Sequence, residues 1–134
     1  MVAMVTTGRQ RSLAWVSTIP HWLYFTALRT NQSWWTNTVV WGAVLACVNQ
    51  SRPQDLYVDQ VAVDPAWRGQ GVTKLLLDAV EAAGRARGCT RLWLSTDPLN
   101  PAVRAWPPLG FSSLGVRRDF KGAGKDREVF EKRL

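Results

Sequence analysis

The sequence has few of the residues from which metal centres and disulfide frameworks are built. Among its 134 residues are two cysteines, Cys47 and Cys89, and one histidine, His21. Both cysteines lie in apolar, strand-like stretches, which is typical of reduced thiols in a core. An ordinary zinc site needs more ligands than these residues supply. We therefore expect no metal site and no disulfide scaffold.

Long apolar runs are also missing. No stretch reaches the roughly 18 apolar residues that a membrane-spanning helix needs. The opening residues, MVAMVTTGRQRSLAW, do not combine an apolar segment with a small-residue cleavage site. These absences predict a cytoplasmic protein with no membrane partner. Hydrophobic residues make up 46% of the chain and charged residues 20%, a globular composition that fits one domain over residues 1–134.

Acidic residues are outnumbered, with 10 Asp and Glu against 17 Lys and Arg, and the formal charge is +7. A basic balance is typical of proteins that bind nucleic acid, an anionic membrane or a polyphosphate ligand, and also of an ordinary solvated surface. The sequence contains no aromatic-and-basic RNA motif and no zinc-finger spacing. A nucleic-acid-binding domain is therefore an alternative that rests on charge alone, and we expect no nucleic-acid partner.

The hydrophobic pattern predicts an α/β (α+β) fold. Residues 17–31 show a helical pattern with capping residues and a proline at the start. A longer helix is predicted from Val72 to about Gly88, with Lys74 and Glu81 on its exposed side. A short helix is predicted near 101–106, and strands are predicted within 33–49 (a hairpin turning at Thr36-Asn37), 56–63, 90–96, 111–120 and 127–134. The result is a single mixed, mostly antiparallel sheet of six or seven strands flanked by helices, with a central parallel β-α-β unit.

One turn carries the clearest chemical signal. In VAVDPAWRGQGVTKLLL, residues 61–77, a strand leads through Arg68, Gly69 and Gly71 into a helix. The first turn of a helix has free N–H groups and a positive dipole end, so it favours an anion. Glycine lets a ligand approach the backbone, and a guanidinium suits phosphate oxygens. The turn predicts a phosphate or pyrophosphate ligand, although glycines that only make a tight turn are the plain alternative.

The turn does not end in the Gly-Lys-Ser/Thr of the ATP-binding loop, and it lacks the spacing of the dinucleotide fingerprint. It instead resembles the acetyl-coenzyme A signature of the GNAT superfamily of N-acetyltransferases. The matching residues are Val61, Val63, Pro65, Arg68 and Gly71, with Thr73 where the family prefers glycine or alanine. A second family pattern is matched by Asn100, Ala102, Trp106, Leu109, Gly110 and Phe111. The resemblance covers roughly residues 34–134, whereas residues 1–33 fit the family poorly.

The resemblance implies acetyl-CoA as cosubstrate. The backbone of Val61 and Val63 would bond the pantetheine arm, and Asn100 would contact this arm from the other side. The pyrophosphate would lie on the main chain of the signature turn. The complete set of expected cofactor-binding residues is Val61, Ala62, Val63, Arg68, Gly69, Gln70, Gly71, Val72, Thr73 and Asn100.

Two residues are the candidates for catalysis. Trp106 takes the place where the family commonly has a tyrosine acid, but an indole N–H cannot usefully give up its proton. Asp59 interrupts an apolar strand next to the cofactor segment and is the first choice for a base, with Asp55 second. Tyr24 and Tyr57 are further possible acids or substrate contacts, and Trp22 and Trp34 are candidates for lining the acceptor pocket.

The interpretation is an acetyl-CoA-dependent N-acetyltransferase that acts on a primary amine of a small molecule or a peptide. The scarcity of acidic residues argues against a polycationic acceptor such as an aminoglycoside. The alternative is a CoA-binding protein of the same fold with little or no transferase activity. A homodimer is plausible from the exposed sheet edges and the many aromatic residues.

Overall fold

The computed structural model describes residues 2–6, 12–16, 22–30 and 38–134. Within these residues the chain forms one mixed sheet of eight strands in the order β1-β2-β3-β4-β5-β6-β8-β7. All neighbouring strands are antiparallel except β5 and β6, which are parallel. The strands are β1 Val2–Thr6, β2 Ser12–Val16, β3 Trp22–Thr30, β4 Thr38–Val48, β5 Asp55–Val63, β6 Arg91–Thr96, β7 Ser112–Arg117 and β8 Arg127–Arg133.

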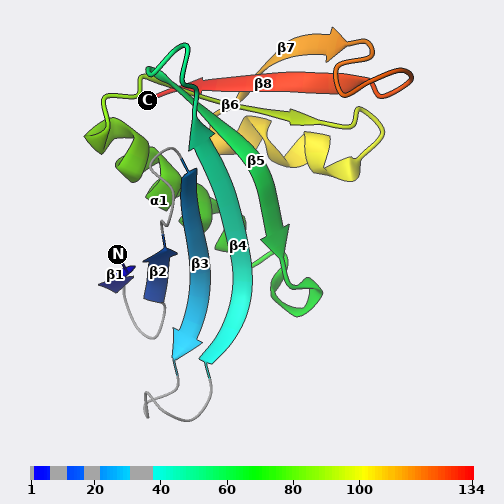
Figure 1. The fold of residues 1–134 in the computed structure, drawn as a ribbon. Coiled ribbons are helices and arrows are strands. Elements are labelled where there is room, and N and C mark those ends of the chain that lie inside the picture. The colour runs from blue at the N-terminus through cyan, green and yellow to red at the C-terminus, as the bar shows by residue number, and fades with distance from the viewer. Residues whose placement is uncertain (1, 7–11, 17–21, 31–37) are drawn as a thin grey trace.

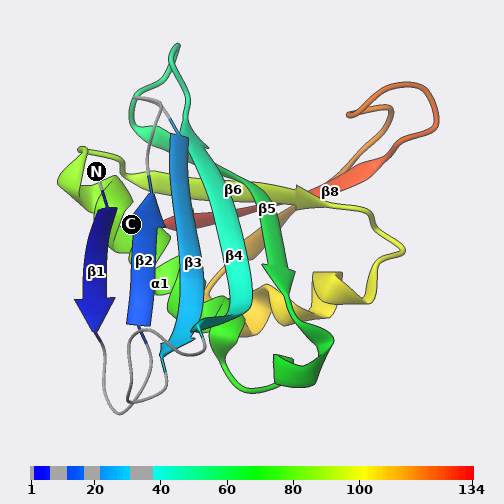
Figure 2. The same ribbon diagram turned by 60° about the horizontal axis from the view of Figure 1, so that its bottom comes forward.

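The α-helix α1, Val72–Ala86, connects the two parallel strands. It lies on one face of the sheet and packs against β3, β4 and β5 (Figures 1 and 2). Three short 3-10 helices complete the helical elements. η1, Pro65–Trp67, precedes α1, and η2, Pro101–Ala105, and η3, Pro107–Leu109, follow β6. The predicted parallel β-α-β unit is thereby confirmed. In the part of the chain that the structure describes, no helix combines the length and apolarity that a membrane crossing needs.

The prediction of a helix within residues 17–31 is wrong. Residues 22–30 form β3, which pairs with β2 on one side and with β4 on the other. Ladder hydrogen bonds and neighbours on both sides outweigh a weak helical pattern in a segment rich in aromatic residues. Because β1, β2 and β3 all join the sheet, the sheet exceeds the predicted six or seven strands. The predicted turn at Thr36-Asn37 and the side chain of Trp34 lie outside the described residues.

The core lies between α1 and the sheet. Leu76, Leu77 and Val80 of α1 are fully buried against Leu56 and Leu92 of the two parallel strands. Glu81, predicted to lie on the exposed side of this helix, is instead only 5% exposed. Its carboxylate is held by Lys132 at 2.6 Å and by Arg85 at 3.4 Å, so it is a paired charge at the edge of the core.

Two residues without side chains let α1 approach the sheet closely. A Cβ at Gly42 would lie 2.7 Å from the carbonyl oxygen of Ala62 and 3.1 Å from Val72 Cγ1. A Cβ at Gly84 would lie 2.7 Å from Leu56 Cδ2. The N-terminal end of α1 therefore packs closely on β4 at Gly42, which is paired with Val63, the last residue of β5 before the signature turn.

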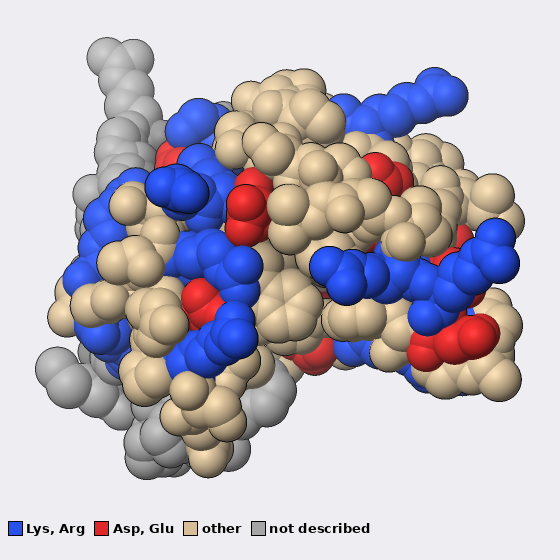
Figure 3. All heavy atoms as spheres, turned by 90° about the horizontal axis from the view of Figure 1, so that it is seen from above, with Lys and Arg blue, Asp and Glu red and all other residues tan. Residues whose placement is uncertain are grey.

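Charge is unevenly spread over the surface. Seen from above, Lys and Arg side chains gather at two ends of the molecule, over the C-terminal end of α1 and over the connection between β7 and β8, with mostly uncharged atoms and a few Asp and Glu side chains between them (Figure 3). The second of these ends borders the site described next.

Candidate functional site

The parallel strands β5 and β6 separate before either of them ends. They pair from Asp55 and Arg91 as far as Val58 and Leu94. Beyond that point β5 runs on to Val63, and its register with β4 shifts between Leu45 and Ala46. Such a bulge bends a strand and increases its twist. The edge of β5 from Asp59 to Val63 therefore faces a gap instead of β6.

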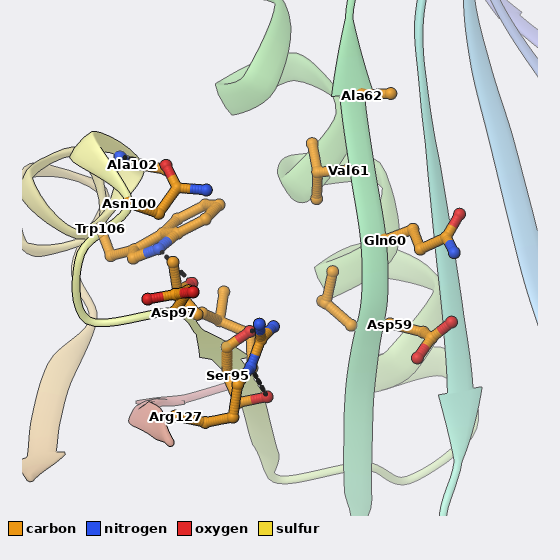
Figure 4. A pocket seen from close by; sticks show the side chains of 13 residues that line it. Asp59, Gln60, Val61, Ala62, Ser95, Asp97, Asn100, Ala102, Trp106 and Arg127 are labelled. Atoms are coloured by element: carbon orange, nitrogen blue, oxygen red, sulfur yellow. Dashed lines mark hydrogen bonds between the residues drawn. The ribbon is translucent and has the colours of Figure 1, made fainter. Parts of the chain in front are cut away.

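This gap is a cleft of about 330 Å³. Its lining residues are Val58, Asp59, Gln60, Val61, Ala62, Leu94, Ser95, Thr96, Asp97, Asn100, Ala102, Trp106 and Arg127. In Figure 4, Val61 projects from β5 toward Asn100 and Trp106 on the opposite wall. The main-chain groups of an unpaired strand edge can bond an extended ligand as though it were another strand.

Asn100 and Trp106 are fixed on the far wall in different ways. The side-chain oxygen of Asn100 accepts a hydrogen bond from the main-chain N–H of Ala102 at 2.9 Å and so caps η2. Its amide nitrogen is directed toward β5 and is available as a donor (Figure 4). Trp106 is only 8% exposed, and its indole N–H donates to Thr96 Oγ1 at 2.9 Å. Its ring also packs edge-on against Phe111, so Trp106 forms part of the wall.

The signature turn continues from the end of β5 into α1. Gly69 and Gly71 have φ values of +74° and +78°, a region that other residues rarely adopt. A Cβ at either glycine would meet no heavy atom within 4 Å, so both glycines border open space. Arg68 Nε donates to the carbonyl oxygen of Val63 at 3.3 Å, and Gln70 Nε2 donates to that of Ala66 at 3.3 Å. The turn is thus tied to the strand that precedes it.

The first turn of α1 offers main-chain donors. Gly71 is the N-cap and has no side chain to cap the helix. The first hydrogen bond of the helix runs from Leu75 N to Gly71 O at 3.1 Å, so the N–H groups of Val72, Thr73 and Lys74 have no helical partner. A second cavity of about 330 Å³ opens here, lined by Val63, Trp67, Arg68, Gly69, Gly71, Val72, Thr73, Lys74, Ala105, Pro108 and Leu109. Main-chain donors, a positive dipole end and the guanidinium of Arg68 make this cavity suited to an anion, whereas the second cation, Lys74, is paired with Asp78 at 2.6 Å.

The candidate bases differ in position. Asp59 is half-buried at the bulge, and its side chain lies on the side of β5 that faces β4, opposite to Val61 (Figure 4). Burial and, second, the charge of Asp59 raise the pKa of Cys47 on β4. Asp55 is 4% exposed and is held by Arg91 through contacts of 2.7 and 3.0 Å, so it belongs to a structural ion pair.

Of the tyrosines, Tyr57 contacts Ser95, which lines the cleft. Its hydroxyl lies 3.3 Å from Ser95 Oγ, and its ring lies 4.2 Å from that of Trp93. The side chains of Trp22 and Tyr24 lie outside the described part of the structure. Nine of the ten expected cofactor residues line the two cavities, and the exception is Gln70, which lines neither and bonds to the main chain of Ala66.

Outside β5, four polar lining residues were not singled out from the sequence: Ser95, Thr96, Asp97 and Arg127. The first three end β6, directly where the strands separate, and a polar run after a buried strand is a signal that could have identified them. Arg127 comes from β8, which pairs with β6 across a separation of about 30 residues. No local pattern marks it.

Comparison with known proteins gives a consistent picture. The family model described as the acetyltransferase (GNAT) family matches residues 6–111. The chain is 36% identical over 89 residues to an L-2,4-diaminobutyric acid acetyltransferase of Streptomyces coelicolor, covering 66% of this chain and 48% of that protein. It is 33% identical over 64 residues to a streptothricin acetyltransferase of Streptomyces lavendulae, covering 47% and 34%. The chain spans half or less of the length of the curated relatives it matches.

Among solved structures, one assigned as a streptothricin acetyltransferase from Bacillus anthracis, in complex with acetyl coenzyme A, has the same fold. The TM-score is 0.72 at 18% identity, over 87% of this chain and 65% of that chain. The likeness at this identity concerns the fold, and it confirms the predicted mixed architecture.

Proposed function

Because the chain belongs to the acetyltransferase (GNAT) family, we propose that it transfers an acetyl group from acetyl-CoA to a primary amine of a small molecule or a peptide. The observation that carries the proposal is the separation of β5 from β6, which opens directly toward the N-terminal end of α1. Acetyl-CoA joins a thioester arm to a diphosphate. The cleft between β5 and β6 would take the arm, and the cavity at the N-terminal end of α1, which follows it along the chain, would take the diphosphate.

The residues fit this cosubstrate. We propose that the free edge of Val61, Ala62 and Val63 bonds the pantetheine amides, and that the amide nitrogen of Asn100 donates from the other wall. The pyrophosphate would lie on the main chain of residues 68–73, where Gly69 and Gly71 leave open space. Thr73 lines this cavity, so its hydroxyl can donate to a phosphate oxygen.

The proposed reaction is direct attack. The amine nitrogen bonds to the thioester carbonyl carbon, the carbon–sulfur bond breaks, the amine loses a proton, and the CoA thiolate takes one up. Orientation of the two reactants and stabilisation of the oxyanion are the protein's main contributions. No step needs a covalent bond to the protein, so Cys47 and Cys89 have no part in it.

The proton acceptor is proposed to be Asp59, which lines the cleft at the bulge from the side of β5 that faces β4. Asp97 lines the same cleft from the end of β6 and is the second candidate. General bases contribute about 10²- to 10⁴-fold to rate. Asp59→Asn and Asp97→Asn, compared for turnover and for acetyl-CoA affinity, separate the two, because only the base should lose turnover while keeping affinity.

The second candidate function is a CoA-binding protein with little or no transferase activity. The observation in its favour is Trp106, whose N–H is already donated to Thr96 and which supplies no proton for the thiolate. Calorimetric titration with acetyl-CoA, followed by a thiol-release assay over a panel of amines, distinguishes the candidates. Saturable binding with thiol release supports the transferase, and binding without release from any amine supports the alternative. No saturable binding would reject both.

The acceptor substrate is proposed only as a class, the primary amines. One relative is named for diaminobutyric acid, which supports a small amine as acceptor. That the protein acts in the cytoplasm, and that it forms a homodimer, stay predictions from the sequence.

A further inference from the structure

The connection between β7 and β8 carries an excess of cations close to the cleft. Five basic residues lie between the end of β7 and the start of β8: Arg117, Arg118, Lys121, Lys125 and Arg127. Among the described residues, the ion pairs involve none of these five side chains. Their charge is therefore available to a ligand.

The two carboxylates of the same segment are used to hold its shape. Asp119 Oδ1 accepts a hydrogen bond from the main chain of Gly124 at 2.6 Å, and Asp126 Oδ1 accepts one from the main chain of Asp119 at 3.0 Å. Main-chain bonds from Lys121 to Lys125 and from Lys125 to Gly122 close the same loop. The segment is thus an ordered support for its lysines, and not a loose basic tail.

A cavity of about 520 Å³ lies beneath this segment. It is lined by Asp97, Pro98, Leu99, Val116, Lys121, Gly124, Lys125, Asp126 and Arg127. Asp97 and Arg127 line both this cavity and the cleft between β5 and β6, so the two spaces adjoin. Three of the five basic residues, Lys121, Lys125 and Arg127, line this cavity.

Arg127 is positioned at the junction by the sheet itself. Its Nη2 donates to the carbonyl oxygen of Ser95 at 2.7 Å, and its Nε lies 3.4 Å from Ser95 Oγ. Figure 4 shows the guanidinium against Ser95 at the end of the cleft. A guanidinium has five N–H donors, so donors remain for a second acceptor. Lys121 is directed to the same region, because its Nζ lies 5.6 Å from the ring centre of Tyr57.

We infer that this cavity binds the acceptor, and that the acceptor is a small amine which also carries an anionic group, a carboxylate or a phosphate. The inference rests on the proposed function. The anion would lie against Arg127, Lys121 and Lys125, and the amine would point past Asp97 into the cleft, toward the thioester. The apolar wall at Leu99 and Val116 suits the hydrocarbon between the two groups.

The arrangement also disfavours polycationic acceptors. Three cations line the cavity against two carboxylates, each of which has one oxygen bonded to a main-chain N–H. A second or third ammonium group on the acceptor would be repelled by the remaining positive charge.

Matched pairs of amines test the inference in the thiol-release assay. β-Alanine is compared with β-alaninamide, and phosphoethanolamine with ethanolamine, so that each pair differs in the anion. We expect the anionic amine of each pair to have the higher kcat/KM. The pair with the larger ratio of kcat/KM values shows whether the site prefers a carboxylate or a phosphate. Arg127→Gln should reduce kcat/KM for the anionic amines about 10- to 100-fold more than for the neutral amines, because only the anionic amines lose a charge-assisted hydrogen bond to the guanidinium.

Two further variants test the inference without relying on Arg127, whose substitution could disturb folding through the lost bonds to Ser95. Lys121→Gln and Lys125→Gln remove exposed cations and should lower the anion preference without lowering thermal stability. The matched control is Arg133→Gln, which removes the same charge. Arg133 is exposed on β8 and lines neither the cleft nor the cavity beneath the β7–β8 connection.

A binding measurement makes the result independent of turnover. Calorimetry on the CoA-loaded protein compares N-acetyl-β-alanine with its amide, and we expect the acid to bind more tightly in a manner that depends on Arg127. No preference for the anion in either readout overturns the inference. Thiol release from neutral amines alone would overturn it as well, while still supporting the proposed function.

Discussion

A single negative charge placed at the N-terminal end of α1 should show whether the signature turn binds the pyrophosphate of acetyl-CoA or only connects β5 to the helix. Gly71 is the residue for this test, because a Cβ there would meet no protein atom within 4 Å and would point into open space. Its φ of +78° penalises most side chains by about 1 to 2 kcal/mol, but Asn and Asp tolerate this region best. Gly71→Asp and Gly71→Asn therefore form a matched pair that differs only in charge.

The expected difference follows from the geometry of the turn. A carboxylate at Gly71 would lie within a few ångströms of a phosphate bound to the first turn of α1. Two unit charges at about 4 Å repel each other by about 1 kcal/mol in water and about 4 kcal/mol at an effective dielectric constant of about 20. The Asp variant should consequently bind acetyl-CoA about 5-fold to 1000-fold more weakly than the Asn variant.

Isothermal titration calorimetry with acetyl-CoA measures this difference, and thermal unfolding of the two variants controls for stability. The free protein should be no less stable with Asp than with Asn, because a carboxylate at a helix N-terminus is favourable. Raising the salt concentration should narrow the difference in affinity. Equal affinities for acetyl-CoA in the Asp and Asn variants would refute the placement of the pyrophosphate at this turn.

Three other predictions address the core and the candidate catalytic residues. Gly42→Ala should lower the free energy of unfolding by about 1 to 3 kcal/mol in urea titrations, because its Cβ would lie 2.7 Å from a backbone carbonyl of β5; an unchanged midpoint would show that α1 can shift. Trp106→Phe should cost about 1 kcal/mol or more of stability through the lost bond to Thr96. Its pH–rate profile should keep the same alkaline limb, and a displaced limb would give the indole a catalytic role. Asp59→Asn should speed alkylation of Cys47 by iodoacetamide at mildly alkaline pH, since removing the charge lowers the raised pKa of this thiol and increases its thiolate fraction. An unaltered alkylation rate would show that the charge of Asp59 does not reach the thiol of Cys47 on β4.

The turn at the proposed coenzyme site could be predicted because its parts are encoded locally. A strand, a proline, an arginine and two glycines followed by a helix specify a turn with free N–H groups through short-range geometry alone. The role of Asn100 was implied by the family resemblance instead, as part of a second short motif, and the structure brings this residue to the wall opposite Val61.

The environment of individual charged residues was harder to predict. Glu81 occupies a polar position in the helical pattern, yet Lys132 from β8 and the packing of α1 bury it. Asp55 was a candidate base, and Arg91 from the neighbouring parallel strand holds it in an ion pair. In both cases the partner is distant along the chain, so the outcome depends on which strands become neighbours.

The sequence by itself determined the signature turn and the strand–helix–strand order around it, because these follow from short-range geometry and local hydrophobic periodicity, and its short motifs indicated the family by resemblance. Only the tertiary structure decided that residues 22–30 form a strand, that β5 and β6 part after Val58, and that Arg127 reaches the end of the cleft. Strand pairing joins residues that are far apart along the chain, and its hydrogen bonds and buried area can override the local preference of any one segment.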